Sequence, residues 1–323
     1  MNLDLLKRNT AEIVTDEELN NLIEQKKSPV AYCGYEVSGP VHIGTMVTIN
    51  KQLDFLNAGL KVKVLLADLH TLLNMKGELE WIEKMAEYWK ACFEALGLKN
   101  AEYVRGSDFQ LDGGYFKSVL ELGLNSTLNR ALRSMQEIAR DIENARVSQV
   151  IYPLMQIADI RALDADIAYG GMEQRKIHML AREILPDIGF GKPICIHTPL
   201  ICSIKGPETK MSSSKPETMI AVDDTPEEIT NKIKGAYCPI EEGVNPILDI
   251  CRLVVMPRTG KFGVSRPEKF GGDVSYDKYE EVERDYLDKR LHPMDLKNAV
   301  ASSLIDVLKP VRDTLEKKGI SRD

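Results

Sequence analysis

A histidine and a glycine stand two positions apart just after the first apolar segment of the chain, within residues 38–45 (SGPVHIGT). If a helix begins here, its free backbone N–H groups and the positive end of its dipole favour a nucleotide phosphate. Gly44 would let the nucleotide approach the backbone, and His42 can donate a hydrogen bond to a phosphate oxygen. Taken alone, the stretch also fits an ordinary turn with a surface histidine.

A second stretch, residues 210–215 (KMSSSK), places two lysines around three serines. Ammonium groups and hydroxyls can follow pyrophosphate as negative charge builds on it and release it afterwards. The Gly, Pro, Ser and Lys content around this stretch predicts a loop at about residues 203–222. A solvated linker has the same composition, so this stretch alone does not decide the function.

Three polar residues recur within the apolar segment 150–159. Tyr152, Gln156 and Asp159 are spaced i, i+4 and i+7, so on a helix they share one face. Burying three polar groups is costly unless they find partners. They therefore indicate either a binding site or a polar stripe on a helix surface.

Alternating and continuous apolar runs predict the elements that position these residues. A strand, a turn with Gly39, a helix at about 43–57 and a second strand form a βαβ unit, the seed of a doubly wound parallel sheet. Paired glycines follow a later strand and open another helix at 173–185, a second place where a ligand could approach the backbone. Strands are expected at residues 30–34, 62–67, 164–168 and 193–196.

Helical patterns occupy the rest of the chain. Residues 1–29 predict helix with a capping box at Thr15 and Glu18. Residues 77–148 predict a helical insertion that splits the sheet. We expect a catalytic domain at 1–223 and a mostly helical domain at 224–323, which contains a second capping box at Thr225 and Glu228 and an amphipathic helix at 295–308.

Composition narrows the classes of protein. The 323 residues are 43% hydrophobic and 28% charged, as in ordinary globular proteins. The net charge of −7 argues against indiscriminate coating of nucleic acid but allows local basic patches. Six cysteines and five histidines are dispersed without a C-x-x-C pair, which predicts reduced thiols and no metal site. With no apolar run of about 20 residues and no signal peptide, we expect a cytoplasmic protein with no membrane partner.

Together and in this order, residues 42–45 and 210–215 resemble the HIGH and KMSKS signatures of class I aminoacyl-tRNA synthetases, which bracket ATP in a Rossmann-like domain. The motifs ADLH (67–70), GMEQ (171–174), KFGGD (269–273) and LHPMDL (291–296) are similar to those of archaeal tyrosyl-tRNA synthetases. This resemblance extends from about residue 6 to residue 308.

The resemblance implies an activity and partners. A tyrosine–tRNA ligase of this family activates tyrosine with ATP, giving tyrosyl-adenylate and pyrophosphate. It then transfers the tyrosyl group to the 3′ end of tRNA(Tyr). ATP is a substrate, Mg²⁺ accompanies its phosphates, no cofactor is tightly bound, and the helical insertion supplies the surface of a homodimer.

The resemblance also implies site residues. Tyr32 and Asp159 would hydrogen-bond the phenolic hydroxyl of tyrosine from either side. The tyrosine-binding set is Tyr32, Glu36, Leu65, His70, Tyr152, Gln156, Asp159 and Gln174. The ATP-binding set is Gly34, His42, Gly44, Thr45, Glu173, Lys210 and Met211. The catalytic set is His42, Gly44, Lys210, Ser212 and Ser213.

For tRNA, the resemblance assigns two arginines to the acceptor stem and three residues of the second domain to the anticodon, and it adds Lys176 as a further tRNA-binding residue. A surface salt bridge is the alternative role for the arginines, and a helix N-cap is the alternative for Asp295. The tRNA-binding set is Arg133, Arg175, Lys176, Phe270, His292 and Asp295.

Some positions depart from the family pattern. Thr45 stands where HIGH ends in histidine, Ser213 where KMSKS has its second lysine, and Pro216 where glycine is usual. Two alternatives stay open. A non-catalytic tRNA-binding paralogue would account for Thr45 and Pro216, and a tryptophanyl-tRNA synthetase would need a pocket for an indole N–H in place of the Tyr32–Asp159 pair.

Overall fold

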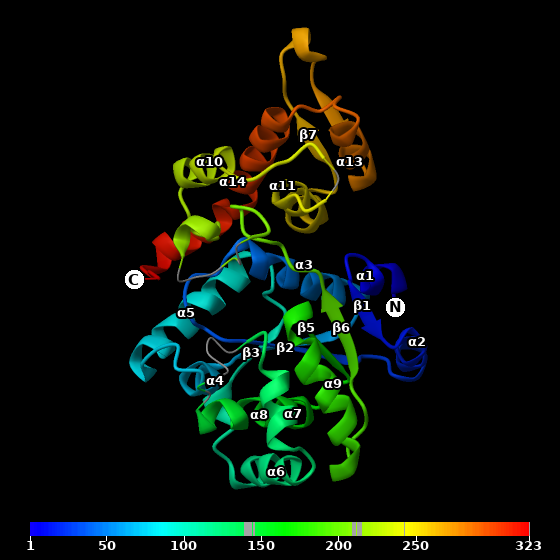
Figure 1. Ribbon diagram of the computed structural model, residues 1–323, viewed down its shortest axis with the longest axis vertical. Coiled ribbons are helices and arrows are strands. Elements are labelled where there is room, and N and C mark those ends of the chain that lie inside the picture. The colour runs from blue at the N-terminus through cyan, green and yellow to red at the C-terminus, as the bar shows by residue number, and fades with distance from the viewer. Residues whose placement is uncertain (139–143, 145, 209–210, 212–214, 242, 323) are drawn as a thin grey trace. The chain divides into compact units, whose positions relative to one another are not determined.

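The computed structural model describes residues 1–323 except 139–143, 145, 209–210, 212–214, 242 and 323 (Figure 1). The chain forms two compact units, which are described separately below. The first unit comprises Met1–Ser38, Lys51–Lys90 and Leu98–Pro199. The second comprises Gly39–Asn50, Ala91–Gly97 and Leu200–Asp323. Within the described ranges, no helix is long and apolar enough to cross a membrane.

A six-stranded sheet forms the centre of the first unit, in the order β1-β6-β5-β2-β3-β4. Only the edge strand β1 runs antiparallel, to β6, and every other pair is parallel. The chain leaves β2 in one direction towards β3 and β4 and returns on the other side as β5 and β6. This order confirms the predicted Rossmann-like, doubly wound sheet and puts its topological switch point between β2 and β5. The strands are β1 (Glu12–Val14), β2 (Val30–Tyr35), β3 (Lys61–Leu66), β4 (Glu102–Arg105), β5 (Ile167–Gly171) and β6 (Ile194–Thr198).

The four predicted strands are confirmed as β2, β3, β5 and β6, with bounds shifted by up to three residues. Buried parallel strands give continuous apolar runs, and these runs allowed the four strands to be predicted from the sequence. The prediction of helix throughout 1–29 is wrong at β1, and the helical insertion at 77–148 is wrong at β4, where the sheet continues. Both missed strands are short edge strands with mostly half-buried residues, so they carry no clear apolar period.

Helices of the first unit pack mainly around α8. Figure 1 shows α6, α7 and α8 gathered side by side, and α8 also contacts α4 and α9. Apolar residues of α8, among them Ile157 and Ile160, join Leu122 of α6 and Ala168 of β5 in one buried core. The capping box at Thr15 is confirmed at the start of α2. The helices are α1 (Leu3–Lys7), α2 (Asp16–Gln25), α4 (Asp68–Leu73), η1 (Gly106–Asp108), α6 (Gly113–Leu124), α7 (Leu128–Ser134), α8 (Val147–Ala162), η2 (Met172–Gln174), α9 (Arg175–Ile184) and η3 (Pro186–Ile188), while α3 (Ile43–Ala58) and α5 (Leu79–Ala95) run through both units.

The described part of residues 224–323 is mostly helical, as predicted, and contains an antiparallel hairpin of β7 (Phe262–Val264) and β8 (Val274–Tyr276) that the sequence did not reveal. The second unit is larger than this segment, because it also includes residues 39–50, 91–97 and 200–223. In Figure 1 the connection between these strands projects beyond α13 and α14. The capping box at Thr225 is confirmed at the start of α10. The other elements are η4 (Pro216–Thr218), α10 (Pro226–Lys234), α11 (Pro246–Ile250), η5 (Cys251–Val255), α12 (Met256–Thr259), η6 (Glu268–Phe270), α13 (Tyr279–Leu287) and α14 (Pro293–Lys318).

The expected N-cap role of Asp295 is wrong. α14 begins at Pro293, and the side chain of His292 accepts the hydrogen bond from the Met294 N–H at 3.1 Å. Proline is favourable at the first helical position because its missing N–H needs no partner there. Asp295 therefore lies inside the first turn, where its negative charge meets the positive end of the helix dipole.

Candidate functional site

Asp159 of α8 is the centre of a buried polar network in the first unit. Its side chain is fully buried. Its Oδ1 atom accepts hydrogen bonds from Gln110 Nε2 and from the Tyr115 hydroxyl, both at 2.7 Å. Its Oδ2 atom lies 3.4 Å from the Tyr32 hydroxyl, which donates to it. One carboxylate oxygen is thus occupied by two strong donors, while the other is approached by Tyr32 at the longer distance of 3.4 Å.

Burial raises the pKa of Asp159 to about 7, against the opposing effect of the hydrogen bonds from Gln110, Tyr115 and Tyr32. Burial also lowers the pKa of His70 to about 4, so its ring is neutral at pH 7. His70 Nε2 lies 3.7 Å from Asp159 Oδ2 and has no hydrogen-bond partner among the residues that the structure describes. Buried polar atoms without a partner are rare and call for a ligand or an ordered water.

Tyr32 and Leu65 reach this network from adjacent strands. Tyr32 of β2 is 2% exposed, and Leu65 of β3 pairs in register with Gly34. A Cβ atom at Gly34 would lie 2.9 Å from the Tyr32 hydroxyl oxygen and 3.7 Å from Leu65 Cδ2. Glycine at this position therefore leaves the space that the Tyr32 hydroxyl occupies. The structure thus brings together four members of the predicted tyrosine-binding set: Tyr32, Leu65, His70 and Asp159.

The polar face predicted for 150–159 is confirmed on α8, because Tyr152, Gln156 and Asp159 are all buried. Gln156 Nε2 donates to Gln174 Oε1 at 3.0 Å. The Tyr152 ring packs edge-on against the His70 ring, with 4.6 Å between their centroids. Burial and the neighbouring Glu36 raise the pKa of the Tyr152 hydroxyl. Hydroxyl and amide oxygens of the predicted tyrosine-binding set therefore lie on and beside this face, whereas the carboxylate of Glu36 is already paired with Lys76 and accepts from Asn74.

Glu173 follows the paired glycines at the carboxyl end of β5, next to the switch point of the sheet. Burial raises the pKa of its carboxyl group. Its Oε2 atom is buried and accepts no hydrogen bond from any described residue. Such an acceptor at a switch point suits a hydroxyl-bearing ligand such as a ribose.

His42 and Gly44 belong to the second unit, at the start of α3. The Gly44 N–H donates to His42 Nδ1 at 3.1 Å, so the ring proton is on Nε2. Burial lowers the pKa of His42 to about 4, which keeps this ring neutral. A Cβ atom at Gly44 would lie 2.9 Å from His42 Cε1 and 3.4 Å from Met211 Sδ, so glycine permits this packing. His42 can thus donate from Nε2 beside a helix N-terminus, whose own charge favours an anion.

A backbone pairing holds His42 against the segment that follows the lysine–serine stretch. The Ile43 N–H donates to the Ile220 carbonyl at 3.0 Å, and the Val222 N–H donates to the Val41 carbonyl at 2.9 Å. The predicted loop at 203–222 also contains η4, which begins at Pro216.

The predicted ATP-binding residues are divided between the units: Gly34 and Glu173 lie in the first, and His42, Gly44, Met211 and the buried Thr45 lie in the second. The predicted catalytic residues Lys210, Ser212 and Ser213 lie outside the described residues.

Among the predicted acceptor-stem residues, Arg175 makes the surface salt bridge that was its alternative role. Its guanidinium donates to both carboxylate oxygens of Glu12, at 2.7 and 2.8 Å. Arg133 is exposed on α7, and Lys176 Nζ donates to Glu137 at 3.1 Å. In the second unit, Phe270 is 59% exposed at the end of η6, a position where an aromatic ring can stack on a base.

Sequence reasoning missed Gln110 and Tyr115 as partners of Asp159. They are 49 and 44 residues away along the chain, and no local pattern marks them. The six cysteines were predicted as reduced thiols, and all six are free.

Comparisons with known proteins agree with this architecture. A family model described as tRNA synthetases class I (W and Y) matches residues 24–309. A tyrosine–tRNA ligase of Methanoculleus marisnigri is 53% identical over 310 residues, which is 96% of this chain and 97% of that protein. A tyrosine–tRNA ligase of Methanocaldococcus jannaschii is 53% identical over 315 residues, 97% of this chain and 99% of that protein.

The crystal structure of a tyrosyl-tRNA synthetase from Archaeoglobus fulgidus, complexed with L-tyrosine, matches with a TM-score of 0.94 and 50% sequence identity. The match covers 97% of this chain and 98% of that one. Similarity of this extent includes both the sheet of the first unit and the helices of the second. The chain therefore belongs to the class I tRNA synthetases of the tryptophan and tyrosine family.

Proposed function

We propose that the chain is a tyrosine–tRNA ligase, which joins tyrosine to tRNA(Tyr) at the expense of ATP. The observation that carries this proposal is the buried pair of Tyr32 and Asp159, whose oxygens face one another at 3.4 Å. Relatives that are named tyrosine–tRNA ligases and are 53% identical over nearly the whole chain support it.

The phenol of tyrosine binds between Tyr32 and Asp159, and its ammonium group binds beside Tyr152, Gln156 and Gln174. Groups arranged for a hydroxyl are left unpaired when phenylalanine binds instead. For such sites, with tyrosyl-tRNA synthetases as the known example, discrimination reaches about 10⁵-fold without an editing step.

In the first step, the tyrosine carboxylate attacks the α-phosphorus of ATP. The bond from that phosphorus to the bridging oxygen breaks, and pyrophosphate leaves with its electron pair. No protein nucleophile is needed, because alignment and charge stabilisation lower the barrier. His42 Nε2–H and the start of α3 bind phosphate oxygens, Glu173 accepts from the ribose, and Lys210 with Ser212 and Ser213 follows the leaving pyrophosphate.

Mg²⁺ enters with ATP as part of the substrate. Across the described ranges, no group of three or more His, Cys, Asp or Glu side chains could hold a metal ion. Mg²⁺ commonly keeps several waters and binds through substrate phosphates. This mode of binding fits an ion that is carried by ATP.

In the second step, a ribose hydroxyl at the 3′ end of the tRNA attacks the acyl carbon of the adenylate, and AMP leaves. The acceptor stem is bound by Arg133, Arg175 and Lys176. Arg175 must release Glu12 before it can bind a group of the RNA. Residues 224–323 form the anticodon-binding domain, and residues 1–223 form the catalytic domain. Exposed Phe270 stacks on an anticodon base, and His292 and Asp295 bind nearby.

We also propose that the protein is a homodimer and is cytoplasmic. The region of the predicted insertion exposes five large apolar side chains on and around α6. Monomeric proteins rarely expose contiguous apolar patches of this kind, which mark interaction surfaces. A two-fold pairing of this face would bury them. The exposed residues are Leu111, Phe116, Leu120, Leu124 and Leu128.

Exchange of labelled pyrophosphate into ATP tests the proposal. Exchange should depend on tyrosine and remain near background with phenylalanine or tryptophan. Tryptophan-dependent exchange would instead identify a tryptophanyl enzyme. Binding of tRNA(Tyr) without formation of adenylate in a single turnover would identify a non-catalytic paralogue.

A further inference from the structure

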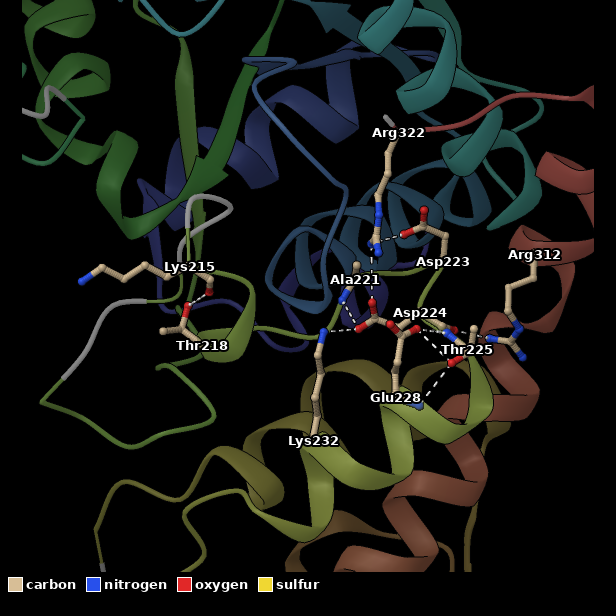
Figure 2. Close-up of polar contacts among 10 residues, drawn as sticks. All are labelled: Lys215, Thr218, Ala221, Asp223, Asp224, Thr225, Glu228, Lys232, Arg312 and Arg322. Atoms are coloured by element: carbon tan, nitrogen blue, oxygen red, sulfur yellow. Dashed lines mark hydrogen bonds and ion pairs between the residues drawn. The ribbon is translucent and has the colours of Figure 1, made fainter.

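Asp224 is a buried carboxylate between the segment that pairs with His42 and helix α10 (Figure 2). Its side chain is 1% exposed. Its Oδ2 atom accepts from the Ala221 N–H at 2.9 Å and from Lys232 Nζ at 2.6 Å. Its own N–H donates back to the Ala221 carbonyl at 3.2 Å. These bonds close a tight turn and anchor it to α10.

Two arginines from α14 and the segment after it reach the same turn, as Figure 2 shows. Arg322 Nη1 lies 2.9 Å from Asp223 Oδ1 and 3.5 Å from Asp224 Oδ1. Arg312 Nη1 lies 3.4 Å from the Asp224 carbonyl oxygen. Three cationic side chains therefore converge on two adjacent aspartates, and the buried member of the pair is Asp224.

This cluster is connected directly to the histidine stretch. Ala221, whose N–H is bound by Asp224, lies opposite His42 in the backbone pairing. The flanking bonds run from Ile43 N–H to Ile220 O at 3.0 Å and from Val222 N–H to Val41 O at 2.9 Å. A shift of the turn at 221–224 would therefore be transmitted through backbone bonds to His42 and to the first residue of α3.

We propose that Asp224 is a positioning residue for tyrosine activation, which holds His42 and the start of α3 in the geometry that binds the ATP phosphates. The inference deepens the proposed ligase function and rests on it. The negative charge of the carboxylate is needed because Oδ2 binds the Lys232 ammonium group and Oδ1 faces the Arg322 guanidinium. An asparagine can keep the bonds to Ala221 and Lys232 through its amide oxygen, but it loses this charge and turns its NH₂ group towards Arg322.

Asp224→Asn in the full-length protein tests this inference. In tyrosine-dependent pyrophosphate exchange, the KM for ATP should rise at least fivefold and kcat should fall at least tenfold. The KM for tyrosine should stay within twofold of the parent, because the Tyr32–Asp159 network lies in the other unit. Asp313→Asn is the matched control, since it removes a carboxylate paired with Lys309 on the exposed side of α14 and should leave all three constants unchanged.

A second variant, at Lys232, keeps the inference testable even if Asp224→Asn does not fold. Lys232→Gln should raise the KM for ATP severalfold, and adding it to Asp224→Asn should cost less than the product of the two single effects, because both act through one ion pair. If Asp224→Asn fails to fold, Lys232→Gln carries the test by the same criterion.

The outcomes separate the two proposals. A parent protein without tyrosine-dependent exchange refutes the ligase function. A parent with exchange and a variant whose KM for ATP is within twofold of the parent refutes the positioning role. Loss of active protein with unchanged KM values for both substrates would mean that Asp224 only stabilises the fold, and this also refutes it.

Discussion

Replacing Asp159 with asparagine keeps the size of the side chain and replaces one carboxylate oxygen with an NH₂ group. The hydrogen-bond donors around Asp159 determine which of the two oxygens is replaced. Gln110 and Tyr115 both donate to Oδ1 at 2.7 Å, so the amide oxygen must take that position. The NH₂ group then occupies the Oδ2 position, which faces Tyr32 and the proposed site of the substrate hydroxyl. There it can donate a hydrogen bond but cannot accept the phenolic proton.

The expected cost follows from the loss of one hydrogen bond to a charged, buried acceptor. Such a bond contributes about 1.5–3 kcal/mol, which corresponds to a decrease of about 10- to 150-fold in kcat/KM for tyrosine. Phenylalanine has no hydroxyl, so in the parent it makes no hydrogen bond to Asp159 Oδ2. Its kcat/KM should therefore stay the same or rise, and the preference for tyrosine should fall by at least the same factor.

The assay is pyrophosphate exchange with tyrosine and with phenylalanine, at pH 8, where the carboxylate form of a group with a pKa of about 7 predominates. In the parent, kcat/KM for tyrosine should fall as the pH drops through 7, whereas the variant should show no such step. Equal losses for both amino acids, or a change of less than threefold for tyrosine, would refute the proposed contact.

The same substitution should change the pH dependence of stability. Burial raises the pKa of Asp159 from 3.8 to about 7, so between pH 4 and pH 7 the folded state binds more protons than the unfolded chain. The free energy of unfolding therefore falls as the pH rises across this window, by up to about 1.4 kcal/mol per pH unit. Asp159→Asn should remove this contribution in urea unfolding measured at several pH values. A variant with the slope of the parent would contradict the assignment.

Three further predictions follow from the described contacts. Tyr115→Phe removes a donor that lowers the pKa of Asp159, so the acidic limb of the pH profile for tyrosine activation should move to higher pH, while Tyr103→Phe should leave it in place. Asp54→Asn removes the carboxylate that Arg8 and buried Lys51 share, which should lower the pKa of Lys51 below about 8 and cost roughly 3 kcal/mol of stability in urea unfolding at pH 7. A loss under about 1 kcal/mol would contradict the assigned ion-pair cluster. Phe116→Asp puts a charge on the exposed face of α6 and should convert a dimer into a monomer in analytical ultracentrifugation, whereas an unchanged mass would show that this face is not the interface.

The sequence by itself determined the elements whose signal is local. The buried strands β2, β3, β5 and β6 read as continuous apolar runs, and the capping boxes marked the first turns of α2 and α10. The polar face of α8 followed from helical spacing alone. The two signature stretches and the accompanying motifs indicated the family, because several motifs in a fixed order are much more specific than any one of them.

Only the tertiary structure decided which distant groups meet. Tyr32 and Asp159 are 127 residues apart, and Asp224 lies 98 residues from Arg322. The partners Gln110 and Tyr115 became visible only where α6 and the segment before it pack against α8. Periodicity reports which face of an element is apolar, but the pairing of polar groups depends on how those faces pack. Short edge strands such as β1 and β4 are fixed by pairing with a neighbour, so their own residues carry too little signal to predict them.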